Sequence, residues 1–298
     1  MELYQLRTFA AVADTGHITR AAEKLHVSQP AVSAHIKGLE EDLRVRLFDR
    51  TPTGMQLTRA GRQLREQAEK VLAEVERLRQ LAATLKGDIV GRLRVGTASD
   101  PEFVRVGEFL HRTVERYPLL EIELHQEVSG AALERVRTGD LDASFYFGDI
   151  TSPDVAGLRL HDMAYCVVAP AAWGERVRNA DWSEIARLPW IVTPSISTHN
   201  RLVRALFSKH GVEPARVVEA DQEPVIASLV VSGVGVSLMR EPLALQKQRA
   251  GEICIWDKAR LQTALWFIYQ ADRRHDPLVE ALLGILGEIW QIAPAPSL

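Results

Sequence analysis

The sequence predicts a multidomain fold: a small, mostly α-helical N-terminal unit, one long helix and a C-terminal α/β region. Three observations support this prediction. Apolar residues recur at helical spacing in three short stretches within residues 1–43, an apolar residue recurs at every seventh position from 64 to 85, and short β-rich runs alternate with helical stretches after Gly87. The length of 298 residues also exceeds what one typical domain uses.

The composition is that of an ordinary globular chain, with 46% hydrophobic residues, 25% charged residues and a net charge of −3. The charge is unevenly spread, because residues 1–62 carry nine Lys and Arg against seven Asp and Glu, whereas the remainder carries 27 against 32. A positive N-terminal segment suits a phosphate-binding surface. No leader-like segment and no apolar run of about eighteen residues is present, so we expect a cytoplasmic protein without a membrane partner.

The first 43 residues are predicted to form three short helices, and the second and third make a tight helix-turn-helix. Only His26 and Val27 separate the second helix from Ser28, which is the expected N-cap of the third helix. Pro30 lies in the first turn of that third helix, where the missing N–H costs nothing. The segment from Leu47 to Leu57 alternates polar residues with a proline and a glycine between short apolar ends. This pattern predicts a β-hairpin that would form a wing.

From Thr58 to Lys86 the sequence predicts one long helix, because it contains no proline and its only glycine, Gly61, lies near the start. A helix of this length would span roughly 43 Å, which is too long for the small preceding unit to cover. We therefore expect its apolar seam to pack against a second chain, with packing on its own C-terminal region as the alternative. The predicted dimerisation residues are Leu64, Val71, Val75, Leu78 and Leu85.

After Gly87 the alternation of short β-rich runs with helical stretches is typical of an α/β domain. Around 210 residues are more than one small sheet needs, so two lobes are expected. The predicted strands are Arg92 to Gly96, Glu121 to His125, Ala143 to Phe147, Tyr165 to Ala169, Trp190 to Thr193, Val236 to Met239 and Leu265 to Tyr269. The predicted helices include Glu102 to Glu115 and Val225 to Ser232.

The helix that begins at Ser28 is the predicted reader of double-stranded DNA. Its polar face carries side chains that can hydrogen-bond base edges or phosphates, and Gln29 can read adenine through two hydrogen bonds. For any single residue a solvated helix face is the alternative. The short turn before the helix and the basic segment after it favour DNA. The predicted DNA-binding residues are Ser28, Gln29, Pro30, Ser33, His35, Lys37, Arg50 and Thr53.

A series of motifs follows in fixed order along the N-terminal segment. They are Phe9-x-Ala-Val-Ala-Asp-x-Gly16, Thr19-Arg-Ala-Ala-Glu-Lys-Leu25, Val27-Ser-Gln-Pro-Ala-Val-Ser33, Ile36-Lys-Gly-Leu-Glu40, Leu47-Phe-Asp-Arg50 and Leu57-Thr-x-Ala-Gly61. This order and spacing resembles the DNA-binding domain of LysR-type transcriptional regulators. The resemblance extends more loosely over the rest of the chain. It implies a winged helix-turn-helix, a linker-helix homodimer or a dimer of dimers (homotetramer), and a two-lobed effector domain like a periplasmic binding protein.

The resemblance has departures. His17-Ile18 stands where the family usually has Ser-Phe, Ala34 replaces a frequent Arg, and Gly54 lies where the wing commonly carries Arg.

The predicted domains are a DNA-binding domain at 1–57, a linker helix at 58–87 and an effector-binding domain at 88–298. Within the last, lobe I covers about 88–160 and 266–298, and lobe II covers about 161–265.

The resemblance implies a small-molecule effector between the lobes, where strands end and helices begin. Ser99 is expected to cap a helix opened by Pro101, and free N–H groups there attract a carboxylate or phosphate. Asp100 disfavours a purely anionic effector, whereas an amino acid or another zwitterion would accommodate it. The effector is therefore left open between a carboxylate and an amino acid. The predicted effector-binding residues are Thr97, Ser99, Asp100, Ser129, Tyr146, Gly148, Ser195, Ser197, Thr198, His199 and Gln222.

No catalytic or metal-binding pattern emerges from the sequence. Gly233-Val-Gly235 is followed by Leu238 where a dinucleotide motif requires a glycine, and no Walker loop, Gly-x-Ser-x-Gly turn or paired histidine motif is present. Cys166 and Cys254 lie in separate apolar runs, where a redox-sensing pair is the alternative to two buried strand cysteines. We expect a sequence-specific transcription regulator controlled by an effector, without enzymatic activity, cofactor or metal.

Overall fold

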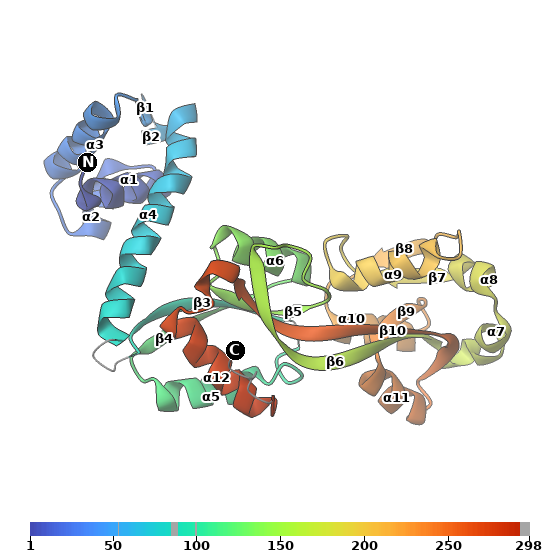
Figure 1. Cartoon of the computed structure of the whole chain (residues 1–298). Helices are drawn as coiled ribbons and strands as arrows, with labels where there is room; N and C mark the ends of the chain where they lie inside the picture. Colours follow the sequence, from blue (N-terminus) through green and yellow to red (C-terminus); the bar gives the residue numbers. More distant parts are fainter. Residues whose placement is uncertain (53, 85–88, 99, 293–298) are drawn as a thin grey trace. The chain divides into compact units, whose positions relative to one another are not determined.

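The computed structural model describes residues 1–52, 54–84, 89–98 and 100–292, and the chain divides into two compact units, Met1–Lys86 and Gly87–Leu298. The described part of the N-terminal unit combines short helices, a hairpin and one long helix (Figure 1). Its elements are α1 (Leu3–Thr15), α2 (Ile18–Leu25), α3 (Gln29–Leu43), β1 (Phe48–Thr51), β2 (Gly54–Leu57) and α4 (Arg59–Thr84).

Helices α1, α2 and α3 enclose a small apolar core that includes Phe9, Val12 and Leu39. The start of α3 is as predicted. The Ser28 hydroxyl accepts a hydrogen bond from the backbone N–H of Ala31 at 3.3 Å, and Pro30 lies in the first turn. Because both features fix where the chain turns into α3, they set the direction in which its exposed N-terminal residues point.

Strands β1 and β2 pair antiparallel and form the predicted wing hairpin. Its first strand is anchored to α3, since one Glu40 carboxylate oxygen accepts hydrogen bonds from the N–H groups of Leu47 at 2.6 Å and Phe48 at 3.3 Å. The start of α4 is packed just as closely. A Cβ atom at Gly61 would lie 2.2 Å from the Leu47 carbonyl oxygen, so only glycine fits there.

The first turns of helix α4 pack against the other elements of the N-terminal unit. Leu64, Ala68 and Leu72, spaced four residues apart, pack into the N-terminal core. Leu64 thus packs on its own unit, because a four-residue spacing follows the 3.6-residue helix repeat and keeps these side chains on the face toward α1, and its part in an intermolecular seam stays a prediction. In contrast, Val71 and Leu78 are 42% and 67% exposed.

The C-terminal unit is an α/β fold built on a six-stranded sheet in the order β4-β3-β5-β10-β6-β9, with a separate parallel pair of β7 and β8. Its strands are β3 (Gly91–Thr97), β4 (Leu120–Gln126), β5 (Ala143–Phe147), β6 (Val155–Pro170), β7 (Pro189–Val192), β8 (Ala215–Glu219), β9 (Ser237–Arg240) and β10 (Ile253–Gln270). Its helices are α5 (Val106–Arg116), α6 (Ser129–Thr138), α7 (Gly174–Asn179), α8 (Trp182–Arg187), α9 (Thr198–Ser208), α10 (Glu223–Val231), α11 (Glu241–Arg249) and α12 (Pro277–Ile289), with the 3₁₀ turns η1 (Ala171–Trp173) and η2 (Ala271–Arg273).

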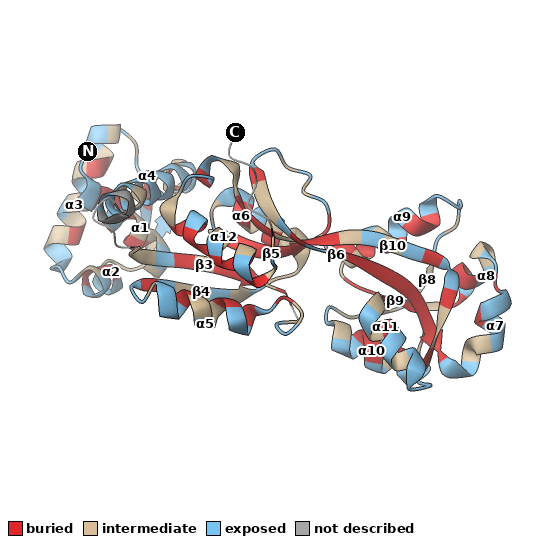
Figure 2. Ribbon diagram, turned by 60° about the horizontal axis from the view of Figure 1, so that its bottom comes forward, coloured by how far each residue is buried: buried red, intermediate tan, exposed pale blue. Residues whose placement is uncertain are grey.

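Two long antiparallel strands, β6 and β10, run through the whole unit and carry a lobe at each end (Figures 1 and 2). Lobe I consists of β3, β4, β5, α5, α6 and α12, and lobe II consists of β7, β8, β9 and the helices α7 to α11. The sequence predicted only short pieces of these two strands and did not predict β8. Figure 2 shows why the lobes cohere: both long strands are lined with buried residues over much of their length.

The first helix of lobe I differs from its prediction. Residues 101–105 form turns, and α5 begins at Val106 after Arg105 in the left-handed region with a φ of 54°. The reason is local: the Asp100 carboxylate accepts a hydrogen bond from the Phe103 N–H at 3.0 Å and holds the chain in a turn. Pro101 therefore opens no helix, and Ser99 lies outside the described residues.

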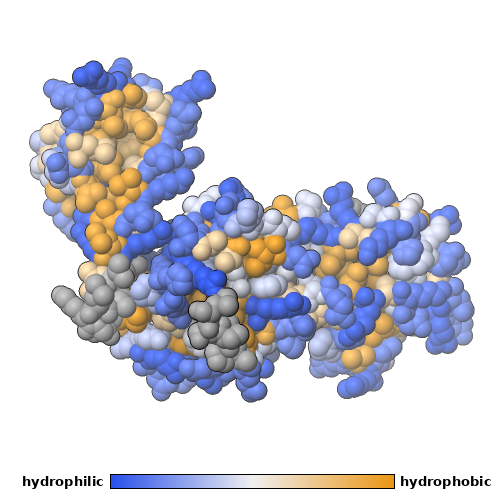
Figure 3. Space-filling model, viewed as in Figure 1, coloured by the Kyte–Doolittle hydropathy of each residue, from blue (hydrophilic) through white to orange (hydrophobic). Residues whose placement is uncertain are grey.

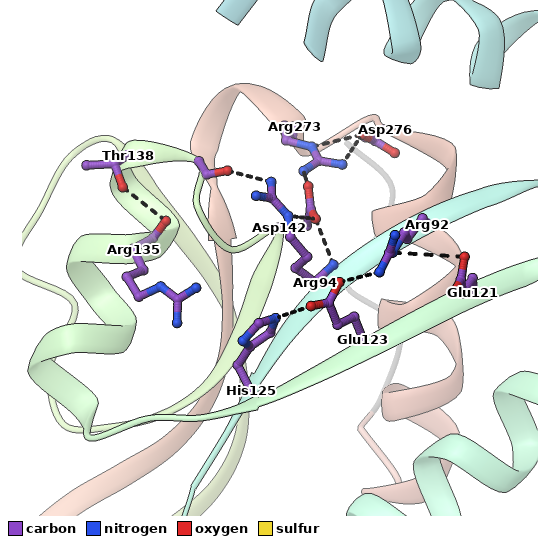
Figure 4. A network of polar contacts seen from close by, with 11 residues as sticks. Arg92, Arg94, Glu121, Glu123, His125, Arg135, Thr138, Asp142, Arg273 and Asp276 are labelled. Carbon is purple, nitrogen blue, oxygen red and sulfur yellow. Dashed lines mark hydrogen bonds and ion pairs between the residues drawn. The ribbon is translucent and has the colours of Figure 1, made fainter. Parts of the chain in front are cut away.

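A polar network on lobe I fixes the turn that contains the Gly139-Asp-Leu-Asp142 segment (Figure 4). Asp142 accepts hydrogen bonds from the Arg94 N–H at 2.8 Å and from Arg273 at 2.6 Å, and Arg94 donates to the Gly139 carbonyl at 2.7 Å. Arg273 is only 6% exposed and also pairs with Asp276, which caps α12. This family-like segment thus stabilises the lobe.

None of the helices in the described ranges is long and apolar enough to cross a membrane.

Candidate functional sites

The first candidate site is a hollow in the N-terminal unit, between the starts of α2 and α3 and the wing. Gln29, Pro30 and Ser33 from α3 line it together with Arg50 from β1, so the structure brings together four of the predicted DNA-binding residues. Gln29 and Arg50 are exposed, and the Gln29 amide donates a 2.8 Å hydrogen bond to the Thr19 hydroxyl. Thr19 orients this glutamine and was missed, because only α3 was searched for readers.

His35 does not line this hollow, and its role in DNA binding stays a prediction. Its ring contacts Tyr4 at a centroid distance of 4.6 Å, and its Nδ1 lies 3.0 Å from the Thr8 hydroxyl on α1. The helical repeat explains this, because two positions along a helix turn a side chain by about 200° away from Ser33. Lys37 is 78% exposed beside Glu41, Ser28 is exposed at the helix start, and Thr53 lies outside the described residues.

Two of the departures from the family pattern meet at the wing. The Met55 N–H donates to the Gly16 carbonyl at 2.7 Å, which holds the hairpin against the turn between α1 and α2. At Gly54, with a φ of 134°, a Cβ atom would lie 2.4 Å from that carbonyl oxygen and 3.3 Å from the His17 ring. The backbone is therefore too close to admit a side chain here, and the wing carries its positive charge at Arg50.

The second candidate site is a cavity of about 400 Å³ between lobes I and II. This volume lies in the range of small-molecule binding pockets. Lobe I supplies the ends of β3, β4 and β5 and the start of α6, whereas lobe II supplies β9 and the starts of α9 and α10. Six predicted effector residues line the cavity: Asp100, Ser129, Ser197, Thr198, His199 and Gln222.

Four other predicted residues are not among the cavity lining. In β5, side chains alternate, so Phe145 and Phe147 face the cavity while Tyr146 points to the opposite side. There the Tyr146 hydroxyl donates to the Asp149 carbonyl at 3.0 Å and accepts from Arg201 at 2.9 Å. The remaining three residues are Thr97, Gly148 and Ser195. Thr97 directly precedes the lining residue Ala98, Gly148 lies against Thr198, and Ser195 is exposed.

The cavity lining contains a buried ion-pair cluster that was not predicted from the sequence. The Arg240 side chain is 8% exposed and pairs with Asp100 of lobe I and with Glu223 of lobe II. The Arg240 N–H also donates to Glu223 at 3.1 Å, and its guanidinium lies 4.2 Å from the centroid of the Phe103 ring. Arg240 directly follows the predicted strand that ends at Met239, so the strand-end rule applied elsewhere would have found it.

The environment shifts the pKa of several lining groups. Burial alone would raise the pKa of Asp100, but the Phe103 N–H and the Arg240 guanidinium together lower it below its ordinary value. Burial lowers the pKa of His199, whose Nε2 lies 3.0 Å from the Leu238 carbonyl and therefore acts as the donor in a neutral ring. Burial, with the Glu223 charge, raises the pKa of the Tyr165 phenol.

The two cysteines lie in β6 and β10, and both thiols have a pKa raised mainly by burial. In the sheet, Cys254 is opposite Ala169 and Cys166 is opposite Arg260, so the register does not pair them. No group of three His, Cys, Asp or Glu suited to a metal ion occurs in the ranges that the structure covers.

A helix-turn-helix with an exposed polar helix start, joined to a two-lobed domain with an interior cavity, defines a DNA-binding regulator with a ligand-binding domain. The comparisons agree. Residues 3–62 match the model for bacterial regulatory helix-turn-helix proteins of the lysR family, and residues 86–291 match the LysR substrate binding domain. The chain belongs to the LysR family of DNA-binding transcriptional regulators, which carry an effector-binding domain.

Three similar proteins illustrate the match. The transcriptional regulator IlvR of Caulobacter vibrioides is 31% identical, with all of both chains covered. ArgP from Mycobacterium tuberculosis has the same fold with a TM-score of 0.68 and 20% identity, over 98% of both chains. Full-length CbnR in complex with its target DNA has a TM-score of 0.62 and 21% identity, covering 97% of this chain and 99% of CbnR.

Proposed function

We propose that this regulator reads its operator with the N-terminal end of α3, in the cytoplasm, as a homodimer or a dimer of dimers. The observation that carries this proposal is the group formed by exposed Gln29 and Pro30 and half-buried Ser33 beside the positive Arg50 of the wing. A glutamine at a helix start can hydrogen-bond base edges in the major groove, and arginine can neutralise a phosphate beside it. CbnR, which shares the fold, is solved in complex with its target DNA, and this supports DNA as the partner here.

The test separates base reading from phosphate contact. DNA sites are selected from a random library with the wild-type protein, and binding to selected and unselected DNA is measured over a range of salt. We expect Gln29→Ala to lose about 1–3 kcal/mol on selected DNA only, and Arg50→Ala to weaken both DNAs and flatten the salt dependence. Gln67→Ala, an exposed glutamine on α4, is the control. Equal losses on both DNAs for Gln29→Ala would refute the reading role.

We infer that α4 carries the dimer contact through the seam residues that its own unit leaves uncovered. Val71 and Leu78 are exposed, Val75 is half-buried, and Leu85 lies outside the described residues. Figure 3 shows apolar side chains gathered on the visible face of the N-terminal unit and continuing along α4. We expect Leu78→Lys to shift the mass in solution from dimer to monomer, and Arg79→Ala, its exposed neighbour, to leave it unchanged. An unchanged mass for Leu78→Lys would contradict the seam.

We also propose that the interlobe cavity binds the effector, and that binding shifts the population of quaternary states on DNA. Six predicted residues from both lobes meet around it, so a ligand there would contact both lobes at once. The test is a thermal-shift panel of small carboxylates, amines and amino acids. A saturable rise in melting temperature that Thr198→Ala abolishes supports the proposal, whereas a rise unaffected by changes in the cavity would place the ligand elsewhere.

A further inference from the structure

The only guanidinium among the described residues that line the cavity is already neutralised. Arg240 contacts two carboxylates, Asp100 and Glu223, so this cluster carries one net negative charge. Binding a carboxylate ligand to Arg240 would require displacing one of them, and a displaced buried carboxylate is costly. Arg240 is therefore unsuited to the role that an arginine commonly has in a ligand pocket, which is to bind an anion.

The remaining charges of the cavity have the same sign. Glu127 lines it and pairs on one side with Arg135, which is not part of the lining. Asp221 is exposed toward the cavity and makes no ion pair to any residue that the structure describes. Four carboxylates thus face one guanidinium in the lining, and His199 adds no positive charge because burial keeps its ring neutral.

A second, independent feature points to a ligand with hydrogen-bonding capacity. Tyr165 is 8% exposed and lines the cavity, yet its hydroxyl makes no hydrogen bond to a described residue. A phenol held this deep normally finds a partner. It lies in the field of Glu223, which disfavours the phenolate. Phe145 and Phe147 complete the wall with aromatic surface. Aromatic rings beside carboxylates are a combination that recognises cations.

We propose that the effector carries a positive charge, an ammonium or guanidinium group as in an amino acid or an amine, held by Asp221 with Asp100 and Glu223 and reached by the Tyr165 hydroxyl. This inference rests on the proposed effector role of the cavity and narrows it to one charge class. A simple carboxylate without a positive group is disfavoured as the effector, because Asp221 and the one net negative charge of the Arg240 cluster both repel it. Arg201, at the edge of lobe II, is bound to the Tyr146 and Thr198 hydroxyls and does not line the cavity.

The experiment uses the full chain and three matched sets of probes. Each set contains an amino acid, its decarboxylated amine and its deaminated acid: leucine, isopentylamine and 4-methylpentanoate; phenylalanine, 2-phenylethylamine and 3-phenylpropanoate; arginine, agmatine and 5-guanidinopentanoate. Melting temperature is followed by tryptophan fluorescence, because all six tryptophans lie in the C-terminal unit. In at least one set, we expect the positively charged members to raise the melting temperature by about 2 °C or more, while a probe without positive charge does not.

Variants then locate the charge. Asp221→Asn is expected to weaken the binding probe about three- to tenfold and to reduce the salt dependence of its affinity. The matched control is Asp257→Asn, another exposed aspartate of the same unit that does not line the cavity. Tyr165→Phe is expected to weaken binding without lowering the melting temperature of the free protein, because its hydroxyl makes no hydrogen bond within the described structure.

The outcomes separate the two proposals. If 4-methylpentanoate or 3-phenylpropanoate, which carry no positive group, binds and Thr198→Ala abolishes the effect, the cavity is the effector site and only the charge class is wrong. If no positively charged probe raises the melting temperature at 10 mM, the inference is overturned as well. If positively charged probes bind equally well to wild type, Asp221→Asn and Thr198→Ala, the ligand lies outside the cavity and both proposals fail.

Discussion

Replacing Arg240 by methionine tests how strongly the two lobes depend on one buried cation. The variant keeps an unbranched side chain of similar length but leaves Asp100 and Glu223, whose side chains are 31% and 17% exposed, facing each other without a counter-charge. Removing one partner of a buried ion pair costs about 3–5 kcal/mol. Because Asp100 is partly solvated, we expect the lower end, about 3 kcal/mol at pH 7.5, which includes the lost contact of Arg240 with Phe103.

The pH dependence gives this prediction its sharpest test. In the wild type the pKa of Asp100 is lowered on folding, so its contribution to stability is present above the unfolded value near pH 3.9 and is lost as the pH falls through the folded pKa. In the variant the guanidinium is gone, so burial raises the pKa of Asp100, and its protonation stabilises the folded state as the pH falls. Between pH 7.5 and pH 5 only the second effect acts, and it shrinks the difference between the two proteins on acidification.

The assay is urea unfolding followed by tryptophan fluorescence at pH 7.5 and pH 5, which reports on the C-terminal unit because all six tryptophans lie there. Arg260→Met is the control, since Arg260 forms a similar two-bond pair with Glu241 on the surface, and we expect little change. A deficit for Arg240→Met that is equally large at both pH values would refute the reasoning, because it would show that lost packing and not uncompensated charge dominates.

Three further predictions concern single contacts, each measured as unfolding of the full chain. Glu40→Ala leaves the Leu47 and Phe48 N–H groups without their acceptor and should lower the stability of the N-terminal unit by about 1–3 kcal/mol, seen by far-ultraviolet circular dichroism, whereas Glu40→Gln retains an acceptor oxygen and should lose less. Gly61→Ala should lose about 1–3 kcal/mol because its Cβ would meet the Leu47 carbonyl, while Gly284→Ala, in an open helical position of α12, should gain about 0.5–1 kcal/mol; the opposite order would contradict the packing described at Gly61. Asp142→Asn weakens the pairing of buried Arg273 and should lower the free energy of unfolding from the fluorescence transition by about 1–3 kcal/mol, and an unchanged free energy would show that Asp276 alone suffices.

The local elements of the N-terminal unit were predictable because their signals are local. A capping serine, a proline in the first helical turn and an apolar stripe fixed the start of α3 at Ser28, and the structure has the same boundary. The predicted recognition residues are those on the face that the stripe leaves free. His35 was counted among them as polar and exposed, although its angle places it on the flank beside α1. The seven-residue spacing likewise did not predict that Leu64 packs in the N-terminal core, since such a spacing does not say which surface covers a residue.

The interlobe cavity was harder, because its walls come from distant parts of the chain. A rule based on strand ends found Asp100, Ser129 and Thr198, which sit where backbone segments turn toward the cavity. It missed residues that face the cavity from within strands, such as Phe145 and Tyr165, because alternation along a strand tells the two faces apart but does not say which one a second lobe will cover. Tyr146 was chosen from the wrong face of the same strand.

In the sequence only Asp100 pointed to the charge preference of the cavity, and the net charge of its lining could not be predicted. Asp100 and Arg240 are 140 positions apart and meet only because β6 and β10 hold the lobes together. Taken alone, Arg240 suggests an anion site and Asp100 a cation site. Once paired, the arginine is neutralised and the surplus of carboxylates decides the preference. Because the pair also joins the two lobes, a positively charged ligand that competes for Asp100 or Glu223 would loosen the lobe contact as it binds, which couples ligand charge to lobe geometry.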